Sequence, residues 1–189
     1  MSRDWSTVLT EHRQVTQTLS DQGPTLDGIA DALIECLRGG RRVYVFGNGG
    51  SASDAQHIAG ELLGRFKRDR AALPAIALNT DTSTMTAIAN DLGYEQVFAR
   101  QLEGLVQTGD VVWALSTSGN SPNVLTALHV ARAKGGIVVG FSGQTGGKMV
   151  ELCTHIFRAP HTCSDRVQEV HTLAYHYLCE RVEGALGCS

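Results

Sequence analysis

Short apolar runs alternate with helix-like segments along this chain, and that alternation limits the possible folds more than any other feature. The predicted strands are residues 42–46, 74–78, 111–115, 137–141 and a weaker 153–158. The runs are almost wholly apolar, which is typical of strands that are buried on both faces. Because such strands alternate with helices, we expect an α/β fold with a parallel sheet covered by helices on both faces.

The segments between the runs have helical periodicity. We expect helices at about 5–20, 25–38, 53–66, 82–90, 94–107, 122–134 and 164–182. Gly23-Pro24 predicts a break, Ser121-Pro122 a favoured helix start, and Ser164 or Asp165 the cap of the last helix. No repeat or linker interrupts residues 1–189, so we predict a single domain with an N-terminal helical extension over 1–40. That extension either makes subunit contacts or covers the domain.

Composition excludes several classes of protein. The net charge of −3 gives no basic surface for nucleic acid, and no apolar run approaches the length of a membrane span. The five cysteines form no C-x-x-C pair, which suits reduced thiols better than disulfides or a zinc knuckle. The first residues also lack the apolar segment of a signal peptide. We therefore expect a cytoplasmic protein with neither a membrane nor nucleic acid as partner.

Two glycine- and hydroxyl-rich loops, residues 47–51 and 116–121, each follow a predicted strand and open a predicted helix. In parallel sheets, ligands bind outside the carboxyl ends of the strands, where both loops lie. Backbone N–H groups and the positive end of the helix dipole favour an anion there. Neither loop has the Gly-Lys-Ser/Thr of a nucleotide-binding loop, so the pair indicates a phosphorylated metabolite rather than ATP.

The first loop has two other interpretations. Gly47-x-Gly49-x-x-Ala52 fits the relaxed dinucleotide fingerprint, which requires an acidic residue at the end of the next strand. Asp81 is late for that role, and the hydroxyl groups of the second loop suit a phosphate or a sugar better than nicotinamide. A tight turn that needs glycine for backbone reasons alone is the other alternative.

His57 and Glu61 share one helix face at a spacing of i, i+4, and Arg65 continues that face. Such a pair is either a solvated surface pair or part of a metal or catalytic site. The last helix carries Gln168, Glu169, His171 and His176. Gln168 and His176 lie roughly 12 Å apart in helical rise, so the spacing alone does not decide between a shared metal and simple packing.

Five motifs in order resemble the bacterial phosphoheptose isomerases of the SIS family. They are GNGGS (47–51), AQHIAGEL (55–62), AND (89–91), STSGNS (116–121) and RVQEVH (166–171). The resemblance covers nearly the whole chain and implies a doubly wound, five-stranded parallel sheet in a homotetramer with active sites near subunit interfaces. It also implies conversion of sedoheptulose 7-phosphate to D-glycero-D-manno-heptose 7-phosphate, the first step toward ADP-heptose for surface glycans such as lipopolysaccharide.

The resemblance also assigns roles to residues. It places one zinc per subunit on His57, Glu61, Gln168 and His176. It implies substrate contacts at Asn48, Gly49, Gly50, Ser51, Glu61, Arg65, Asn90, Asp91, Ser116, Thr117, Ser118, Ser121 and Gln168. An aldose–ketose isomerisation through an enediol needs a base and an acid, and we assign these roles to Glu61 and His176.

A non-enzymatic branch of the same family, which binds the replication initiator DnaA, is the alternative. Residues 73–81 resemble that branch. The chain nevertheless has Glu61, Ser118 and His176, where the binding branch departs from the enzymes. We therefore expect the enzyme.

Overall fold

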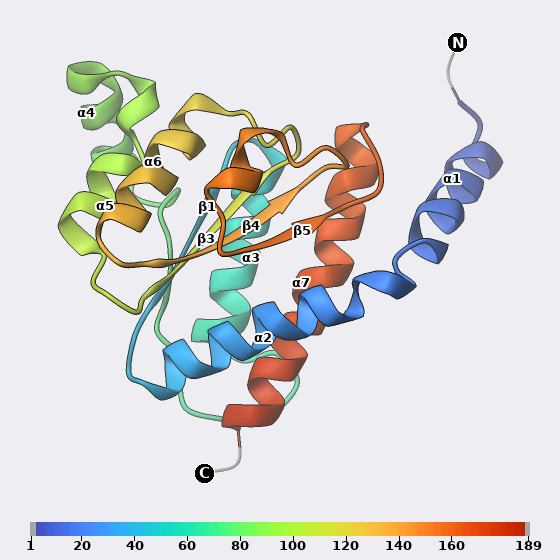
Figure 1. Ribbon diagram of the computed structural model, residues 1–189, viewed down its shortest axis with the longest axis horizontal. Helices are drawn as coiled ribbons and strands as arrows, with labels where there is room; N and C mark the ends of the chain where they lie inside the picture. Colours follow the sequence, from blue (N-terminus) through green and yellow to red (C-terminus); the bar gives the residue numbers. More distant parts are fainter. Residues whose placement is uncertain (1–2, 188–189) are drawn as a thin grey trace.

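Five parallel strands form the central sheet, in the order β2-β1-β3-β4-β5 (Figure 1). The structure is a computed structural model that describes residues 3–187, so Cys188 lies outside the described residues. The strands are β1 (Val43–Gly47), β2 (Ala75–Ala77), β3 (Val111–Ser116), β4 (Ile137–Ser142) and β5 (His155–Arg158). The α-helices are α1 (Trp5–Gln17), α2 (Gly23–Arg38), α3 (Gly50–Leu63), α4 (Thr82–Leu92), α5 (Ala99–Leu105), α6 (Pro122–Ala133) and α7 (Ser164–Leu186). The predicted doubly wound, five-stranded parallel sheet is confirmed.

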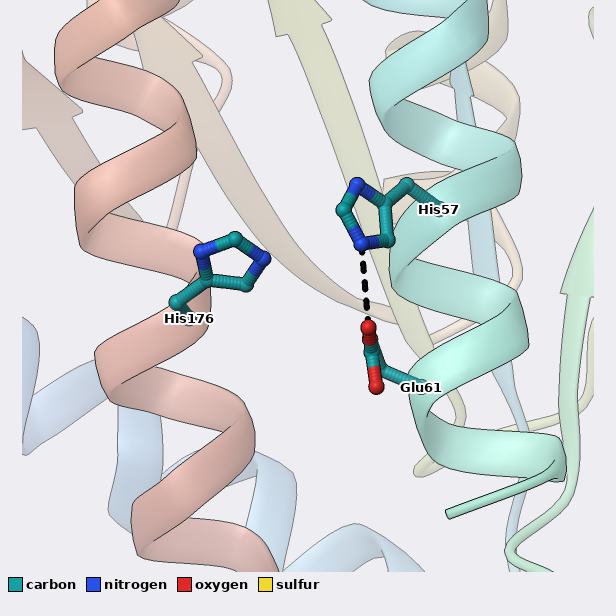
Figure 2. A group of neighbouring side chains, drawn as sticks. All are labelled: His57, Glu61 and His176. Atoms are coloured by element: carbon teal, nitrogen blue, oxygen red, sulfur yellow. Dashed lines mark hydrogen bonds and ion pairs between the residues drawn. The ribbon is translucent and has the colours of Figure 1, made fainter. Parts of the chain in front are cut away.

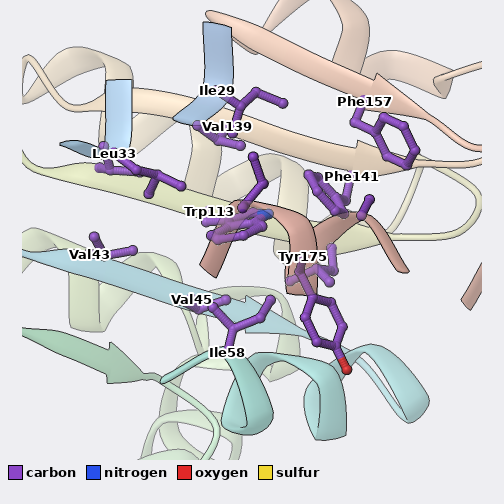
Figure 3. Close-up of a cluster of buried hydrophobic side chains, with 14 of the residues drawn as sticks. Ile29, Leu33, Val43, Val45, Ile58, Trp113, Val139, Phe141, Phe157 and Tyr175 are labelled. Atoms are coloured by element: carbon purple, nitrogen blue, oxygen red, sulfur yellow. The ribbon is translucent and has the colours of Figure 1, made fainter. Parts of the chain in front are cut away.

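Helices cover both faces of the sheet. Val43 and Val45 of β1 belong to a core cluster with buried residues of α2, α3 and α7 (Figure 3). Tyr44 and Phe46 point to the other face and join a cluster with residues of α5 and α6. Successive strand residues alternate between faces, so apolar side chains at every position are what a sheet buried on both sides requires.

The predicted helix at 94–107 is wrong in its first turn. The chain forms a 3₁₀ turn at Tyr94–Gln96, and α5 begins only at Ala99. Between them Val97 and Phe98 are fully buried, and the Phe98 ring packs 4.7 Å from that of Phe46. Packing these side chains into the core outweighs the helical propensity of the segment.

Four helix ends also differ from the prediction. The predicted break between the first two helices is present but lies before Gly23, and Gly23 and Pro24 open α2, where proline's missing N–H costs nothing. The first helix ends at Gln17, and a 3₁₀ turn at Ser20–Gln22 follows. The N-cap of α7 is Cys163, not Ser164 or Asp165, because the Cys163 carbonyl accepts the first intrahelical N–H, from Val167, at 3.0 Å. Helix α7 then continues to Leu186.

Helix α1 extends away from the layered body and reaches it through α7 (Figure 1). Val15 is the one buried residue of this helix. Two polar contacts also join it to α7. The buried Arg166 donates to the Val8 carbonyl at 3.1 Å, and His12 lies 2.7 Å from a carboxylate oxygen of Glu169. Its role in subunit contacts stays a prediction. Across the described residues, no helix combines the length and the apolar character that a membrane crossing needs.

A buried ion pair fastens the loop after α3 to the end of α7. The Glu183 carboxylate accepts the backbone N–H groups of Phe66, Lys67 and Arg68 at 2.8–3.0 Å, and Nε of Arg70 lies 3.3 Å away. Burial raises the pKa of Glu183, but the three N–H donors and Arg70 outweigh it, so the pKa lies below its usual value. One carboxylate therefore holds three successive residues of the loop.

We expect Glu183→Gln to lower the free energy of unfolding by about 3 kcal/mol, because it leaves Arg70 buried without its counter-charge. Glu180→Gln is the matched control: Glu180 is exposed on the same helix and pairs with Lys67 at 2.9 Å. The control should change stability by less than about 0.5 kcal/mol. Urea unfolding of the three proteins measures the difference, and equal stability of both variants contradicts the assignment.

His171 is fully buried in α7 and fastens that helix to β4. Its Nε2 lies 3.1 Å from the Ser142 carbonyl, and its ring packs 5.3 Å from that of Phe141. Burial lowers the pKa of His171 to about 4, although the bond to Ser142 opposes the shift. The imidazole is therefore neutral in the folded protein at neutral pH.

Stability should fall in acid because unfolding frees His171 to take up a proton. The folded pKa of about 4 lies below the unfolded value of 6.5, so the stabilisation is complete above pH 6.5 and decreases as the pH falls toward 4. The free energy of unfolding decreases by about 3 kcal/mol over this range. His171→Leu should flatten this slope in urea unfolding at several pH values, whereas the exposed His129→Leu should leave it unchanged. An unchanged slope in His171→Leu contradicts the prediction.

Candidate active site

The two glycine- and hydroxyl-rich loops border one pocket at the carboxyl edge of the sheet. They follow β1 and β3, the neighbouring strands between which the strand order reverses, and open α/β sheets bind their ligands at such a point. The pocket has a volume of about 240 Å³. It is lined by Asn48, Ser51, Leu115, Ser116, Thr117, Ser121, Ser164 and Gln168.

Three helices begin at this pocket. Helix α3 starts at Gly50, α6 at Pro122 and α7 at Ser164, each beside a residue of the pocket lining. The eight lining residues carry no charged side chain. Any attraction for an anion therefore has to come from backbone N–H groups, hydroxyls and three helix dipoles, which together suit a phosphate group.

The glycines of the first loop make room for close packing. A Cβ at Gly47 would lie 2.7 Å from both the Leu115 carbonyl and the Ser51 side chain. Gly49 has φ +57, a conformation that side-chain-bearing residues rarely adopt. A Cβ at Gly50 would collide with the side-chain amide of Gln168. Packing and backbone conformation thus account for glycine at these three positions. At Gly50 the missing side chain also lets Gln168 lie against the start of α3, beside the pocket.

Hydroxyl groups of the second loop pair with one another. The side-chain oxygens of Ser116 and Ser121 lie 3.1 Å apart, and those of Thr117 and Ser164 lie 3.2 Å apart. Ser164 joins the pocket from the start of α7, a position that the sequence analysis did not select. Ser118 is exposed, accepts the backbone N–H of Asn120 at 3.1 Å and is not among the lining residues.

Asn123 is a further residue that the sequence analysis missed. Its buried side-chain amide exchanges two hydrogen bonds of 2.9 Å with the amide of Asn48, and Tyr94 donates its hydroxyl to Asn48 at 3.2 Å. Both ends of the Asn48 amide are therefore engaged within the protein. An asparagine in the second position of a helix gave no sequence signal, because its partner is 75 residues away.

Asp81 does not act as the acidic residue of a dinucleotide site. It is the N-cap of α4, where its carboxylate accepts the Thr84 N–H at 3.0 Å and the Thr84 hydroxyl at 2.6 Å. These bonds lower the pKa of Asp81, so the carboxylate is well satisfied as a cap. The dinucleotide alternative is therefore not supported.

His57, Glu61 and His176 form one cluster between α3 and α7 (Figure 2). One potential ligand atom of each residue lies within 4.8 Å of the others. Nε2 of His57 is 2.9 Å from a carboxylate oxygen of Glu61, and the His57 and His176 rings are 5.0 Å apart. The i, i+4 pair is thus not an isolated surface pair, because a third residue from a distant helix completes it.

Aromatic side chains around the cluster restrict the orientations of its two histidine rings. The Tyr175 hydroxyl lies 2.9 Å from Nδ1 of His57, on the side of the ring opposite Glu61. The Phe66 ring stacks on His176 with centroids 5.6 Å apart. Burial and the neighbouring His57 lower the pKa of His176, so its imidazole is neutral at neutral pH and has a lone pair for a metal or a proton.

Helices α3 and α7 run side by side in the same direction. Gly50 meets Gln168, His57 meets Tyr175, and Phe66, in the loop after α3, meets Glu183, so the contacts follow the same order along both segments. The pocket lies at the start of this pair. The cluster lies about 10 Å further along the helix axis, given the rise between Gly50 and His57. One helix pair thus carries both sites.

Other predicted site residues lie outside the three-residue cluster. Gln168 lines the pocket, so its place among the metal ligands stays a prediction. Arg65 is exposed and pairs with Asp69 at 2.7 Å. Asn90 and Asp91 lie on the exposed end of α4, hydrogen-bonded to each other at 2.7 Å, and do not line the pocket. Tyr94, on the turn after α4, is the residue that connects that region to Asn48.

Comparisons with known proteins agree with this architecture. The family model described as "SIS domain" matches residues 9–143. The chain is 48% identical to a phosphoheptose isomerase of Helicobacter hepaticus, over 93% of this chain and 90% of the relative. It is 46% identical to that of Pelobacter propionicus, over 98% of this chain and 99% of the relative.

A solved structure gives the same result. The structure of the phosphoheptose isomerase of Neisseria gonorrhoeae superposes with a TM-score of 0.90 at 34% identity, over 95% of this chain and 96% of that one. These comparisons do not favour the DnaA-binding alternative. The chain therefore belongs to the SIS domain family and, within it, to the phosphoheptose isomerases.

Proposed function

We propose that this isomerase converts sedoheptulose 7-phosphate to D-glycero-D-manno-heptose 7-phosphate through an enediol, as the first step toward ADP-heptose and lipopolysaccharide. One observation carries the proposal: the same two parallel helices hold a hydroxyl-lined pocket at their start and an acid–base cluster further along. A sugar phosphate has this polarity, with an anion at one end and a carbonyl at the other.

The pocket would hold the terminal phosphate. The N–H groups of Gly49 and Gly50 and the hydroxyls of the second loop supply donors near three helix starts. Within the proposal, the phosphate and sugar contacts are Asn48, Gly49, Gly50, Ser51, Ser116, Thr117, Ser118, Ser121 and Gln168. The Asn123 amide would orient Asn48 for this task.

Proton transfer would be the work of Glu61 and His176. The Glu61 carboxylate takes the proton from the carbon next to the carbonyl and returns it to the neighbouring carbon, while His176 moves a proton on the oxygen side. Burial and the neighbouring His57 lower the pKa of His176, so a neutral imidazole is present to take up that proton. Arg65, Asn90 and Asp91, which are exposed, would contact the sugar chain or a neighbouring subunit.

The cluster suits one zinc ion per subunit. Two imidazoles and a carboxylate are zinc ligands, and their atoms already lie within 4.8 Å of one another. The proposed ligands are His57, Glu61, His176 and Gln168. A zinc ion bound there supplies a Lewis acid that polarises the substrate carbonyl. The carboxylate of Glu61 has two oxygens, so it can serve both as a ligand and as a base.

The rest of the proposal concerns the whole protein. We propose that residues 1–189 form one SIS domain that assembles as a homotetramer, with α1 making subunit contacts. Its single buried side chain supports this role, because the helix leaves its other faces uncovered. A reducing cytoplasm suits Cys36, Cys153, Cys163 and Cys179, which are free thiols.

Replacing the proposed base tests the function directly. We expect Glu61→Gln and His176→Gln to lower kcat by about 10²–10⁴-fold, because each removes a proton-transfer group. The assay incubates the metal-loaded protein with sedoheptulose 7-phosphate and follows the aldose by NMR. Glu180→Gln, an exposed change on α7, is the control and should keep full activity.

Near-normal turnover by Glu61→Gln refutes the assignment of the base. Absence of product from the unmodified protein, together with binding of DnaA, refutes the isomerase and supports the alternative.

Metal removal is a second test. Protein stripped with a chelator should lose turnover, and added zinc should restore it, because the carbonyl then lacks its Lewis acid. Elemental analysis verifies that the stripped sample is metal-free. Full activity in that sample rules out the metal part of the proposal while leaving the isomerisation in place.

A further inference from the structure

His57 presents its two ring nitrogens to different surroundings. Nε2 points toward Glu61 and the interior of the cluster (Figure 2), and Nδ1 lies 2.9 Å from the Tyr175 hydroxyl. Tyr175 is almost completely buried, with 1% of its surface exposed, so its hydroxyl is shielded from water. The geometry thus fixes which nitrogen could face a metal and which one meets the protein.

Asp54 lies one turn before His57 on α3, and one of its carboxylate oxygens lacks a hydrogen-bond donor in the described part of the chain. Its Oδ2 is buried and has no hydrogen-bond partner among residues 3–187. Asp54 precedes His57 by three residues, so its carboxylate lies on the same face of α3 as the imidazole whose Nδ1 the Tyr175 hydroxyl approaches at 2.9 Å. A buried carboxylate oxygen without a donor is costly, so the site gains when a donor turns toward it.

The Tyr175 hydroxyl has one proton and two possible acceptors. If it donates to Nδ1, the proton of a neutral His57 lies on Nε2, and that nitrogen cannot bind a metal. If it donates to Asp54, its oxygen accepts a proton from Nδ1 of His57, and Nε2 keeps its lone pair. The second arrangement satisfies Asp54 as well, and in it a metal ion takes the place of the proton that Nε2 donates to Glu61 in the metal-free protein.

We propose that Asp54 and Tyr175 are positioning residues for the metal centre: a hydrogen-bond chain from Nδ1–H of His57 to Tyr175 and on to Asp54 holds Nε2 free as a metal ligand. This inference rests on the metal site of the proposed function and adds its outer partners. Such partners set the orientation and the tautomer of metal-binding histidines.

The test is the zinc affinity of the metal-free protein, measured by competition with a chromogenic chelator. Tyr175→Phe and Asp54→Ala should each weaken zinc binding about 10- to 100-fold. Asp54→Asn keeps an oxygen acceptor and should lose less than Asp54→Ala. Tyr177→Phe is the matched control, because Tyr177 is exposed on the same helix and donates its hydroxyl to Asp27, and it should bind zinc as the unmodified protein does.

The double variant distinguishes a chain from two separate effects. Because Asp54 acts through Tyr175, Asp54→Ala should cost nothing further once Tyr175 is phenylalanine. Side-chain ¹⁵N NMR of the zinc-loaded protein should place the His57 proton on Nδ1. Affinity within twofold of normal in Tyr175→Phe, or losses that add in the double variant, overturns the proposal.

Folding and the parent site are checked separately. Thermal unfolding of the metal-free proteins verifies that each variant is folded, and if Tyr175→Phe is not, Asp54→Ala and Asp54→Asn decide the question. His57→Ala tests the site itself: zinc affinity equal to that of the unmodified protein refutes the metal site together with this inference. Turnover of sedoheptulose 7-phosphate by the unmodified protein tests the isomerisation independently.

Discussion

The parallel packing of α7 against α3 is the constraint on which the site depends. Neither helix carries a complete site: α3 contributes Glu61 and His57, and α7 contributes His176 and Gln168. The two are kept in register at both ends, by Gln168 against Gly50 at the start and by the Glu183 carboxylate on the loop after α3. His171, bonded to the Ser142 carbonyl, ties α7 to the sheet between these points. A displacement of either helix would separate the cluster as well as reshape the pocket.

The position of the pocket follows from the sheet. Parallel strands bring the ends of β1 and β3 side by side, and the helices that follow begin there with their positive ends together. The pocket has no charged side chain among its lining residues, and these helix ends are what suit it to an anion. The cluster, by contrast, lies where two helices face each other past their first turns, and its chemistry comes from side chains rather than from backbone dipoles.

Much of this was predictable from local patterns. The apolar runs predicted all five strands. The loops at 47–51 and 116–121 predicted a binding site at the ends of β1 and β3, where the structure has a pocket. The sequence spacing of Gln168 and His176 could not decide between a shared ligand and simple packing, because it holds no information about the neighbouring helix. The sequence did not point to Asn123, Ser164 or Tyr175 for the same reason. Each makes its contact with a residue from another part of the chain. The false first turn at 94–98 shows burial of Phe98 prevailing over local propensity.

The shared helix pair also fixes the distance between the pocket and the cluster. A straight helix rises by a fixed amount per residue, so the separation between the anion pocket and Glu61 cannot adapt to a shorter molecule. A compound with fewer carbons could anchor its phosphate and still fall short of the carboxylate. Under the proposed function, selectivity for the length of a carbon skeleton would thus be built into the secondary structure itself, before any side chain makes a specific contact.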